Sequence, residues 1–240
     1  MSEPVVVAID GPSASGKSTV SRLVAKALGY LYVDSGAMYR AITWKVLREG
    51  FDVNDREQVV ALVHRVKLDF EIVEGAARMR VDGVDPGEAV RAPEVAERVS
   101  IVAAVPEVRQ VLVAQQRSLT RFGSLVMEGR DIGSVVFPET PFKFYLDADP
   151  QVRAQRRAKD YAAMQIATDP NRVAQALAQR DRLDSSRAVA PLQIALGAVV
   201  INNSNLTPEQ TAQIILDHIR QAGVRRGAMT VTGRQGGGCR

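Results

Sequence analysis

Cysteine is almost absent from this chain, and so are long apolar segments. The single cysteine among the 240 residues, Cys239, stands next to the last residue. One thiol excludes an intrachain disulfide framework and a cysteine-ligated metal site. No stretch approaches the roughly 18 consecutive apolar residues of a transmembrane helix, and the first residues lack the basic segment of a secretory signal. We therefore expect a cytoplasmic protein without a membrane partner.

Aromatic residues and blocks of like charge are also scarce. Phe, Trp and Tyr make up 5% of the chain, which leaves few rings on which the bases of a nucleic acid could stack. The net charge is +4, and it comes largely from arginines scattered over the second half. Such an excess favours anionic partners, and its distribution fits small phosphate ligands. Apolar residues at 46% and charged residues at 24% are typical of a globular protein with an ample core.

Short β-branched segments alternate with helical patterns along most of the chain. Strands are expected at 5–9, 30–34, 124–129, 142–148 and 198–204, and helices at 17–28, 37–49, 92–122 with a break near Pro106, after Asp149-Pro150, after Asp169-Pro170, and at 207–223. Each Asp-Pro pair supplies an N-cap and a first-turn proline, and Thr207 with Gln210 forms a capping box. The alternation predicts an α/β fold with a parallel sheet covered by helices on both faces.

Two segments depart from this alternation. Residues 67–86 alternate polar and apolar around Gly75, which predicts a β-hairpin that belongs to an insertion. The residues from Val224 onward are rich in glycine and arginine and have no periodicity. We expect 224–240 to be a disordered tail and 1–223 to form the core.

A phosphate-binding loop lies between the first strand and the first helix. The residues GPSASGKS, which begin at Gly11, satisfy the pattern G-x-x-x-x-G-K-S/T in the required strand–loop–helix context. The glycines let backbone N–H groups approach phosphate oxygens, and the helix N-terminus adds its dipole. Lys17 can reach the β- and γ-phosphates, and Ser18 can ligand Mg²⁺. The loop indicates nucleotide binding and leaves open what happens to the phosphate.

Arginines cluster further along the chain, mostly where a predicted strand gives way to a loop or helix. In an open α/β sheet this edge binds ligands, and guanidinium groups suit phosphate. In chain order the clusters are Asp34 with Arg40, Arg130 with Asp131, a basic patch of Arg153, Arg156 and Arg157, and Arg180, Asp184 and Arg187 on one predicted helical face. The basic patch could close over bound substrates and stabilise the charge of phosphoryl transfer. Taken alone, each cluster could also be a solvated surface group.

The absence of two motifs argues against two classes of nucleotide-binding protein. The base-reading N-K-x-D of GTPases is absent, and so is the apolar strand ending in a free Asp-Glu pair that a motor ATPase requires. Several arginines able to hold a second anion favour transfer to a phosphorylated acceptor. The alternatives are another small-molecule kinase of the same architecture and a regulatory ATPase that binds nucleotides or nucleic acid.

Six segments, taken in order, resemble the bacterial cytidylate kinases, a family of nucleoside monophosphate kinases. They are DGPSASGKST, DSGAMYR, EGRDIG, VFP, FYLDA and RDRLDSSRAVAPL, and the likeness runs from about Val5 to Ala222. It implies a P-loop kinase core with an inserted CMP-binding region at about 62–105 and an arginine-rich lid at about 150–168. It also implies transfer of the γ-phosphoryl group of ATP to CMP or dCMP with Mg²⁺, in pyrimidine nucleotide metabolism. We expect a monomer that binds these nucleotides and no nucleic acid.

The resemblance further assigns roles to individual residues. ATP binding falls to Gly11, Pro12, Ser13, Ala14, Ser15, Gly16, Lys17, Ser18 and Thr19, with Ser18 as the metal ligand. Catalytic roles fall to Lys17, Arg130, Arg153 and Arg157. Acceptor binding falls to Ser35, to Arg40, Arg130 and Arg187 at the phosphate, to Arg180 and Asp184 near the ribose, and to Ser100, Arg109 and Asp131 at the cytosine. An Asp and an Arg complement the amino group and ring acceptors of that base.

Overall fold

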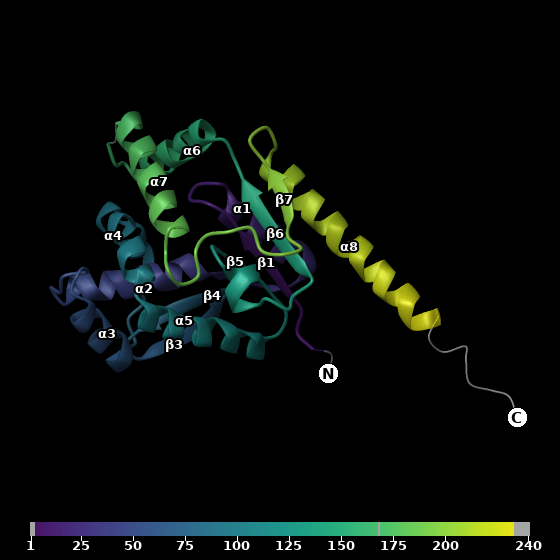
Figure 1. Ribbon diagram of the computed structural model, residues 1–240, viewed down its shortest axis with the longest axis horizontal. Coiled ribbons are helices and arrows are strands. Elements are labelled where there is room, and N and C mark those ends of the chain that lie inside the picture. The colour runs from purple at the N-terminus through teal and green to yellow at the C-terminus, as the bar shows by residue number, and fades with distance from the viewer. Residues whose placement is uncertain (1–2, 168, 233–240) are drawn as a thin grey trace, which may run out of the picture.

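A seven-stranded sheet organises the chain (Figure 1). The computed structural model describes residues 3–167 and 169–232. The strands are β1 Val6–Asp10, β2 Leu31–Asp34, β3 Leu68–Val73, β4 Ala76–Val81, β5 Leu125–Gly129, β6 Phe142–Asp147 and β7 Val199–Asn202. Their order is β3-β4-β2-β5-β1-β6-β7, and among these strands every neighbouring pair is parallel except β3 with β4. The predicted α/β class is confirmed.

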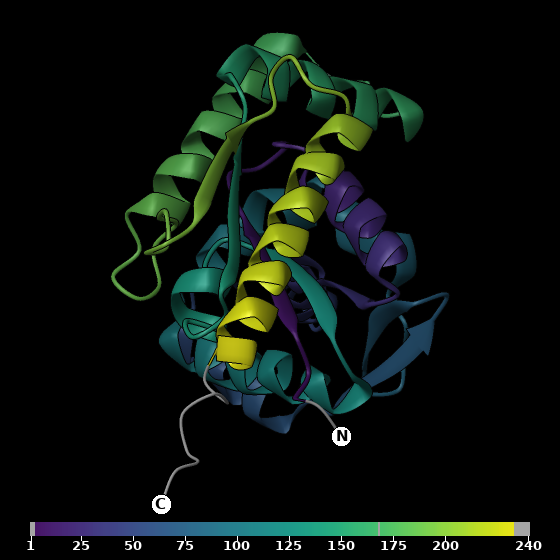
Figure 2. The same ribbon diagram turned by 90° about the vertical axis from the view of Figure 1, so that its right-hand side faces the viewer.

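Helices cover both faces of this sheet. They are α1 Lys17–Leu28, α2 Ser35–Arg48, α3 Arg56–Arg65, α4 Pro93–Ala104, α5 Pro106–Ser118, α6 Pro150–Ala163, α7 Pro170–Ser185 and α8 Pro208–Thr232, with short turns η1 Gly87–Arg91, η2 Leu119–Phe122 and η3 Ile132–Val136. Figure 2 shows α8 lying beside α1 across one face. None of the helices in the described ranges combines the length and apolarity needed to span a bilayer.

Strand β1 shows why the sequences of the central strands are apolar at consecutive positions. Val7 and Ile9 pack in the cluster that contains residues of α1 and α8, whereas Val6 and Ala8 pack on the opposite face, which η2 and η3 cover. Because successive side chains of a strand point to opposite faces, a strand covered on both sides is apolar at every position.

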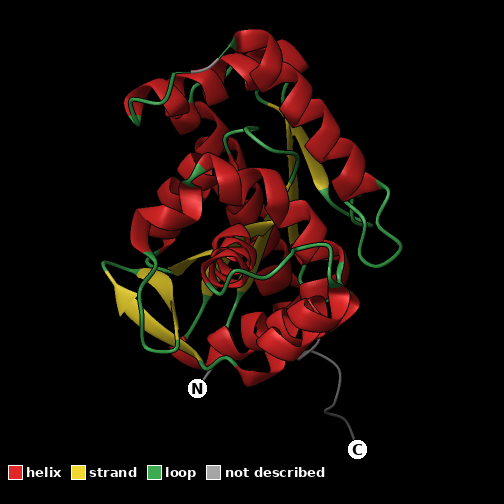
Figure 3. Cartoon of the chain, turned by 90° about the vertical axis from the view of Figure 1, so that its left-hand side faces the viewer, coloured by secondary structure: helices red, strands yellow, loops and turns green. Residues whose placement is uncertain are grey.

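The hairpin extends the main sheet. Strand β4 pairs with β2 through Tyr32 and Ala76, and Figure 3 shows the hairpin at one edge of the molecule. The expected insertion boundary at 62 falls inside α3, a helix whose bounds were not predicted. Its signals were present, because Asp55 caps it by accepting a hydrogen bond from the Gln58 N–H at 3.1 Å, and Val59 and Leu62 form its buried face.

Helix ends follow most of the expected cap signals. Asp169 accepts a hydrogen bond from the Asn171 N–H at 3.0 Å, and Thr207 and Gln210 exchange hydrogen bonds as a capping box. Asp149 makes no such side-chain bond at the start of α6.

Two predicted segments, the C-terminal tail and the lid, differ in their bounds from the helices of the structure. Helix α8 continues to Thr232, so the boundary expected at 223 falls inside a helix. Residues 233–240 lie outside the described residues, and the disordered tail stays a prediction. Helix α6 spans most of the lid expected at about 150–168, and residue 168 also lies outside the described ranges.

Candidate active site

The carboxyl ends of β1, β2 and β5 bring three sequence motifs together. Strand β1 pairs with β5 up to Asp10 opposite Gly129, and β2 pairs with β5 up to Asp34 opposite Glu128. The phosphate loop, the DSG turn and the EGRD turn therefore begin side by side, although they are distant in the sequence. This parallel register places them at the edge where α/β sheets bind ligands.

The phosphate loop depends on two glycines in the left-handed region of the backbone. Gly11 has φ +150° and Gly16 has φ +88°. A Cβ atom at Gly11 would lie 2.1 Å from the backbone oxygen of Leu146, so no other residue fits there without moving strand β6. Gly16 is the N-cap of α1, and it lets the chain turn so that the first helical N–H groups face the loop.

Lys17 holds its ammonium group inside the loop. The side chain is buried, and its Nζ donates to the backbone oxygen of Pro12 at 2.6 Å and to Ser15 Oγ at 3.4 Å. Burial lowers the pKa of Lys17 well below its ordinary value, and the nearby positive charge of Arg130 lowers it further. An anion bound in the loop would relieve both effects, because it would supply the missing countercharge.

Helix α6, the expected lid, contacts the phosphate loop through three arginines. Arg153 donates to the backbone oxygen of Ser13 at 3.2 Å, and Arg157 donates to the Ser13 hydroxyl at 3.1 Å. Arg156 donates to the backbone oxygen of Ser15 at 3.3 Å. The predicted basic patch is thus brought to the loop, where each guanidinium bonds to an oxygen of the protein itself.

Two residues that the sequence analysis missed hold the lid in this position. Asn203, directly after β7, donates to the Ser15 oxygen at 2.8 Å and accepts from Arg156 at 3.0 Å. Asp181 of α7 forms an ion pair with Arg153. The signal for Asn203 was its position at the end of a strand on the ligand-binding edge, whereas nothing local distinguishes Asp181.

A buried carboxylate lies behind Ser18. Ser18 Oγ donates to Glu128 Oε2 at 3.0 Å, and the hydroxyl of Tyr32 donates to the other oxygen of Glu128. Burial and the nearby carboxylate of Asp34 raise the pKa of Glu128. Glu128 is part of the EGRDIG segment, whose sequence alone did not indicate a role for this residue.

These oxygen donors fit Mg²⁺, which prefers oxygen ligands and usually takes one or two from the protein and the rest from phosphates and water. Ser18 and Glu128 would be those protein groups. In the described part of the chain no cluster of three or more His, Cys, Asp or Glu side chains could hold a metal alone. A magnesium ion would therefore depend on the nucleotide phosphates for most of its ligands.

All nine residues predicted to bind the acceptor line one cavity next to Lys17 and Ser18. They are Ser35, Arg40, Ser100, Arg109, Arg130, Asp131, Arg180, Asp184 and Arg187. The cavity volume is about 110 Å³, whereas small-molecule sites usually measure about 300–1,000 Å³. A nucleotide therefore requires the elements around the cavity to move apart.

Asp184 connects three of the elements around this cavity. It accepts hydrogen bonds from Arg130 Nε at 2.9 Å and from the hydroxyl of Ser100 at 2.9 Å. Burial alone would raise the pKa of Asp184, but the guanidinium groups of Arg130 and Arg180 outweigh burial and lower it. The carboxylate stays ionised and fixes Arg130 against the wall of the cavity.

Several guanidinium nitrogens of the cavity are buried without a hydrogen-bond partner in the described chain. They are Nε of Arg40, Arg109 and Arg180 and Nη2 of Arg187. Burial and the neighbouring Arg130 lower the pKa of Arg180 to about 9. Buried donors normally find partners, and crowded cations are stabilised by an anion. These groups are therefore suited to bind an anion.

Arg187 reaches the cavity by a different route from the one predicted. Helix α7 ends at Ser185, so Arg187 does not share a helical face with Arg180 and Asp184. The chain turns at Ser186, and Arg187 Nε donates back to the Asp184 carbonyl at 3.2 Å. The turn, and not helical periodicity, places this guanidinium in the cavity.

Arg109 and Asp131 form a buried ion pair, with side-chain exposures of 3% and 5%. Arg109 also donates to the Ala103 oxygen at 3.3 Å and lies over the ring of Tyr39 at 5.3 Å. A carboxylate has further lone pairs, so Asp131 can accept from Arg109 and from a base amino group together.

Known proteins are similar to this chain in sequence and in fold. The model of the cytidylate kinase family matches residues 7–221. Curated cytidylate kinases from Caldanaerobacter subterraneus subsp. tengcongensis and Pelotomaculum thermopropionicum are 42% and 43% identical over 90% and 89% of this chain, and 95% of each relative is covered. A crystal structure of an uncharacterized protein from Eubacterium ventriosum covers 91% of this chain and 99% of its own with a TM-score of 0.50 and 11% identity, a likeness of fold alone. The chain therefore belongs to the cytidylate kinase family.

Proposed function

We propose that this protein transfers the γ-phosphoryl group of ATP to CMP or dCMP and releases ADP with CDP or dCDP. One observation carries the proposal. The unpartnered guanidinium nitrogens of Arg40, Arg180 and Arg187 line the same cavity as Lys17 and Ser18 of the phosphate loop. A phosphate bound to the arginines would therefore face the terminal phosphate of a nucleotide bound to the loop.

On the donor side, the loop would bind the ATP phosphates through its backbone N–H groups. Lys17 would leave the Pro12 oxygen for the transferring phosphoryl group, whose charge spreads over three oxygens in the transition state. Ser18, supported by Glu128, would hold Mg²⁺, which neutralises charge on the β- and γ-phosphates when bound. Arg153 and Arg157 of the lid would add positive charge and exclude water.

On the acceptor side, Arg40, Arg130 and Arg187 would bind the phosphate of CMP, and Arg180 and Asp184 would lie near the ribose. We assign the cytosine to Ser100, Arg109 and Asp131. The reaction needs no dedicated general base, because the attacking oxygen belongs to an anionic phosphate. Positioning and charge neutralisation are then the main contributions of the protein.

One chain supplies every residue of this site, and we propose that the enzyme acts as a cytoplasmic monomer. It would bind nucleotides through local arginines, without a nucleic-acid partner. Sedimentation of the purified protein with and without CMP tests the monomer, and a stable dimer in both states would contradict it.

A substrate panel tests the reaction itself. The protein is mixed with ATP and Mg²⁺, CMP, dCMP, UMP, AMP and GMP are offered separately, and ADP is followed. CMP and dCMP should give the fastest turnover. ADP formation without an acceptor, or equal rates with purine acceptors, would contradict the proposed function.

A further inference from the structure

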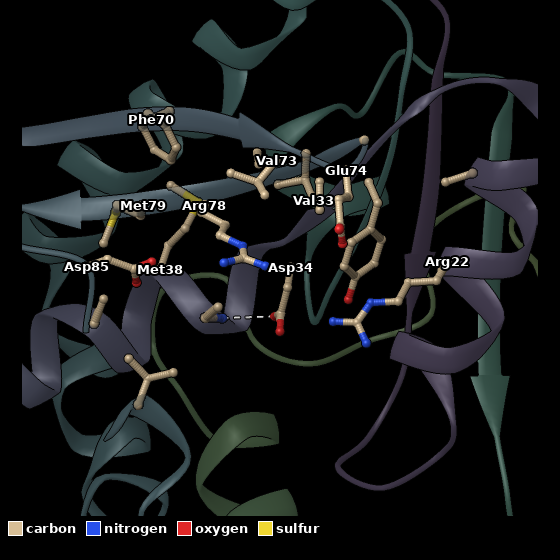
Figure 4. A pocket seen from close by; sticks show the side chains of 18 of the residues that line it. Arg22, Val33, Asp34, Met38, Phe70, Val73, Glu74, Arg78, Met79 and Asp85 are labelled. Carbon is tan, nitrogen blue, oxygen red and sulfur yellow. Dashed lines mark hydrogen bonds between the residues drawn. The ribbon is translucent and has the colours of Figure 1, made fainter. Parts of the chain in front are cut away.

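A second, larger cavity lies beside the proposed active site, between α1, α2, η1 and the β3–β4 hairpin (Figure 4). Its volume is about 910 Å³, within the range of about 300–1,000 Å³ that small-molecule sites occupy. Lys17, Ser18, Arg130 and Asp184 do not line it. Of the nine residues proposed to bind the acceptor, Arg40 alone lines it, so the two cavities adjoin at that side chain.

The cavity results from the way in which the hairpin joins the sheet. In the described structure β2 and β4 pair at one position, Tyr32 with Ala76, where the Tyr32 N–H also donates to the Gly75 oxygen at 2.8 Å. Past this point β4 continues against β3 alone, while β2 ends at Asp34. The space between the two diverging strands is left open as a cavity.

One wall of this cavity is apolar. The half-buried ring of Phe70 is its accessible part, and the buried side chains of Val33, Met38, Met79 and Val90 lie behind it. Strands β2, β3 and β4 and helix α2 contribute to it (Figure 4). An apolar wall with an aromatic ring suits a flat ring system, which buries its faces against such side chains.

Positive side chains enter from opposite sides. Arg22 projects from α1 and Arg78 from β4, with Asp34 between them (Figure 4), and Lys26 follows Arg22 by one helical turn. Within the described residues none of these three cations is paired with a carboxylate, and Arg22 lies over the Tyr32 ring at 4.8 Å. Cations held apart across a cavity are suited to an extended chain of phosphates, which carries several charges.

Two carboxylates are also available for a ligand. Glu74 stands at the hairpin turn with φ +50°, and Asp85 precedes η1. The other carboxylates of the lining, Asp34 and Glu88, are already paired with arginines at 2.8 and 3.2 Å. Glu74 and Asp85 can accept hydrogen bonds from hydroxyl or amino groups, but they would repel a ligand that is only phosphate.

We propose that this cavity binds a phosphorylated nucleoside as an effector. Its phosphates would lie between Arg22, Lys26 and Arg78, its flat base would pack against the wall around Phe70, and its hydroxyl groups would face Glu74. This set combines an apolar wall, cations and acceptors, as a nucleotide requires. None of these three features by itself would favour a nucleotide over other ligands.

The effector would act on the acceptor site through Asp34 and Arg40, which line both cavities. Asp34 accepts from Arg40 Nη2 at 2.8 Å. An effector phosphate near this pair would attract Arg40 away from the acceptor and add repulsion against the phosphate of CMP. Effector and CMP should therefore weaken each other's binding by the same factor. This coupling rests on the role proposed above for Arg40.

Calorimetry with a blocked active site tests the binding. CTP is titrated into enzyme saturated with a bisubstrate nucleotide in which adenosine and cytidine are joined through five phosphates. CTP should still bind, with an affinity lowered by the coupling factor because the acceptor site is filled. Arg78→Gln should weaken that binding at least about tenfold further. Arg80→Gln is the control, because Arg80 is exposed on the same strand, pairs with Glu71 and does not line the cavity.

Three results would overturn the effector site. These are the absence of CTP binding to the blocked enzyme, equal affinity in the Arg78→Gln and Arg80→Gln variants, and tripolyphosphate binding as tightly as CTP. The last result would show a phosphate site without nucleoside recognition.

Steady-state kinetics test the coupling separately. CTP should raise the KM for CMP severalfold more in the Arg80→Gln enzyme than in the Arg78→Gln enzyme, with equal basal rates. Equal inhibition would overturn the coupling. If no variant, nor the natural chain, phosphorylated CMP, the proposed function would fail, while the calorimetry would still report on the cavity.

Discussion

The donor half and the acceptor half of the site are built in opposite ways. At the phosphate loop, Lys17 and the lid arginines donate to oxygens of the protein itself, including those of Pro12, Ser13 and Ser15. In the acceptor cavity, several guanidinium nitrogens are buried without any partner among the described residues. The side-chain donors of the donor half are therefore already bonded to protein oxygens, whereas the acceptor half has N–H groups that are free to bond to a ligand.

This difference predicts different costs of binding. ATP has to displace existing hydrogen bonds, so it gains only the difference between two sets of contacts. CMP meets donor nitrogens that are already desolvated and positioned, although Arg40, Arg109 and Arg130 are each also paired with a carboxylate. The acceptor half is preorganised in its polar groups, although its cavity of about 110 Å³ must still open to admit the nucleotide.

The largest expected effect comes from Lys17→Met. The variant keeps the length of the side chain and removes its charge, so kcat should fall by about 10³-fold. The affinity for CMP should change little, since Lys17 belongs to the donor half. Single-turnover rates and calorimetry with CMP measure the two quantities. A loss of CMP binding comparable to the loss of rate would contradict the division into two halves.

Arg187→Ala should act on the acceptor half. Loss of one charge-assisted hydrogen bond costs about 1.5–3 kcal/mol, so kcat/KM for CMP should fall by up to about 10²-fold, with the KM for ATP unchanged. Arg182→Ala is the matched control, because Arg182 is exposed on the last turn of α7 and does not line the cavity. The assignment of Arg187 would be wrong if the two variants behaved alike.

Asp131→Asn should alter the choice of base. The amide keeps an oxygen for Arg109 and presents an N–H₂ group to the base, so the preference for CMP over UMP should drop about 10- to 30-fold. Competition assays with both nucleotides in one mixture measure this ratio. A fall in ATP affinity with an unchanged CMP/UMP ratio would place Asp131 outside the base site.

Arg157→Ala tests whether the lid contributes to the transfer step. Arg157 bonds to the Ser13 hydroxyl at 3.1 Å in the free enzyme, and it should exchange this contact for the transferring phosphate. We expect kcat to fall about tenfold while the KM for CMP is kept. Lys159→Ala, on the exposed side of the same helix, should leave kcat unchanged. Equal effects would mean that the charge of the lid acts only from a distance.

Gly36→Ala should have the smallest effect. A Cβ atom there would lie 2.9 Å from Arg40 Nη1 and 3.2 Å from Asp34 Oδ1, so Arg40 has to shift by a few tenths of an ångström. The KM for CMP should rise about fivefold because the guanidinium is displaced, and thermal stability should hardly change. An unchanged KM would show that Arg40 has room to adapt.

Local sequence signals were sufficient for the parts of the site that depend on adjacent residues. The phosphate loop was predicted because Gly11 and Gly16 meet a backbone requirement that no distant contact alters. The arginine clusters were recognised because they follow strands and resemble a known family, and all nine acceptor residues line one cavity. The α/β class followed from periodicity alone.

Other features needed the tertiary structure. No local pattern shows that Asn203 and Asp181 hold the lid arginines, or that Tyr32 and Ser18 share the carboxylate of Glu128. The effector cavity depends on the single pairing of Tyr32 with Ala76. Helix α3 did not need the tertiary structure, because its cap and apolar face are present in the sequence, although its bounds were not predicted.

The sequence by itself determined the phosphate loop, the fold class and the identity of the charged groups, because these depend on backbone geometry and periodicity within a few neighbouring residues. Only the tertiary structure decided which charges are already paired and which are not. Pairing depends on the register of the parallel strands and on the packing of α6 and α7 over the sheet, which bring together residues far apart in the chain.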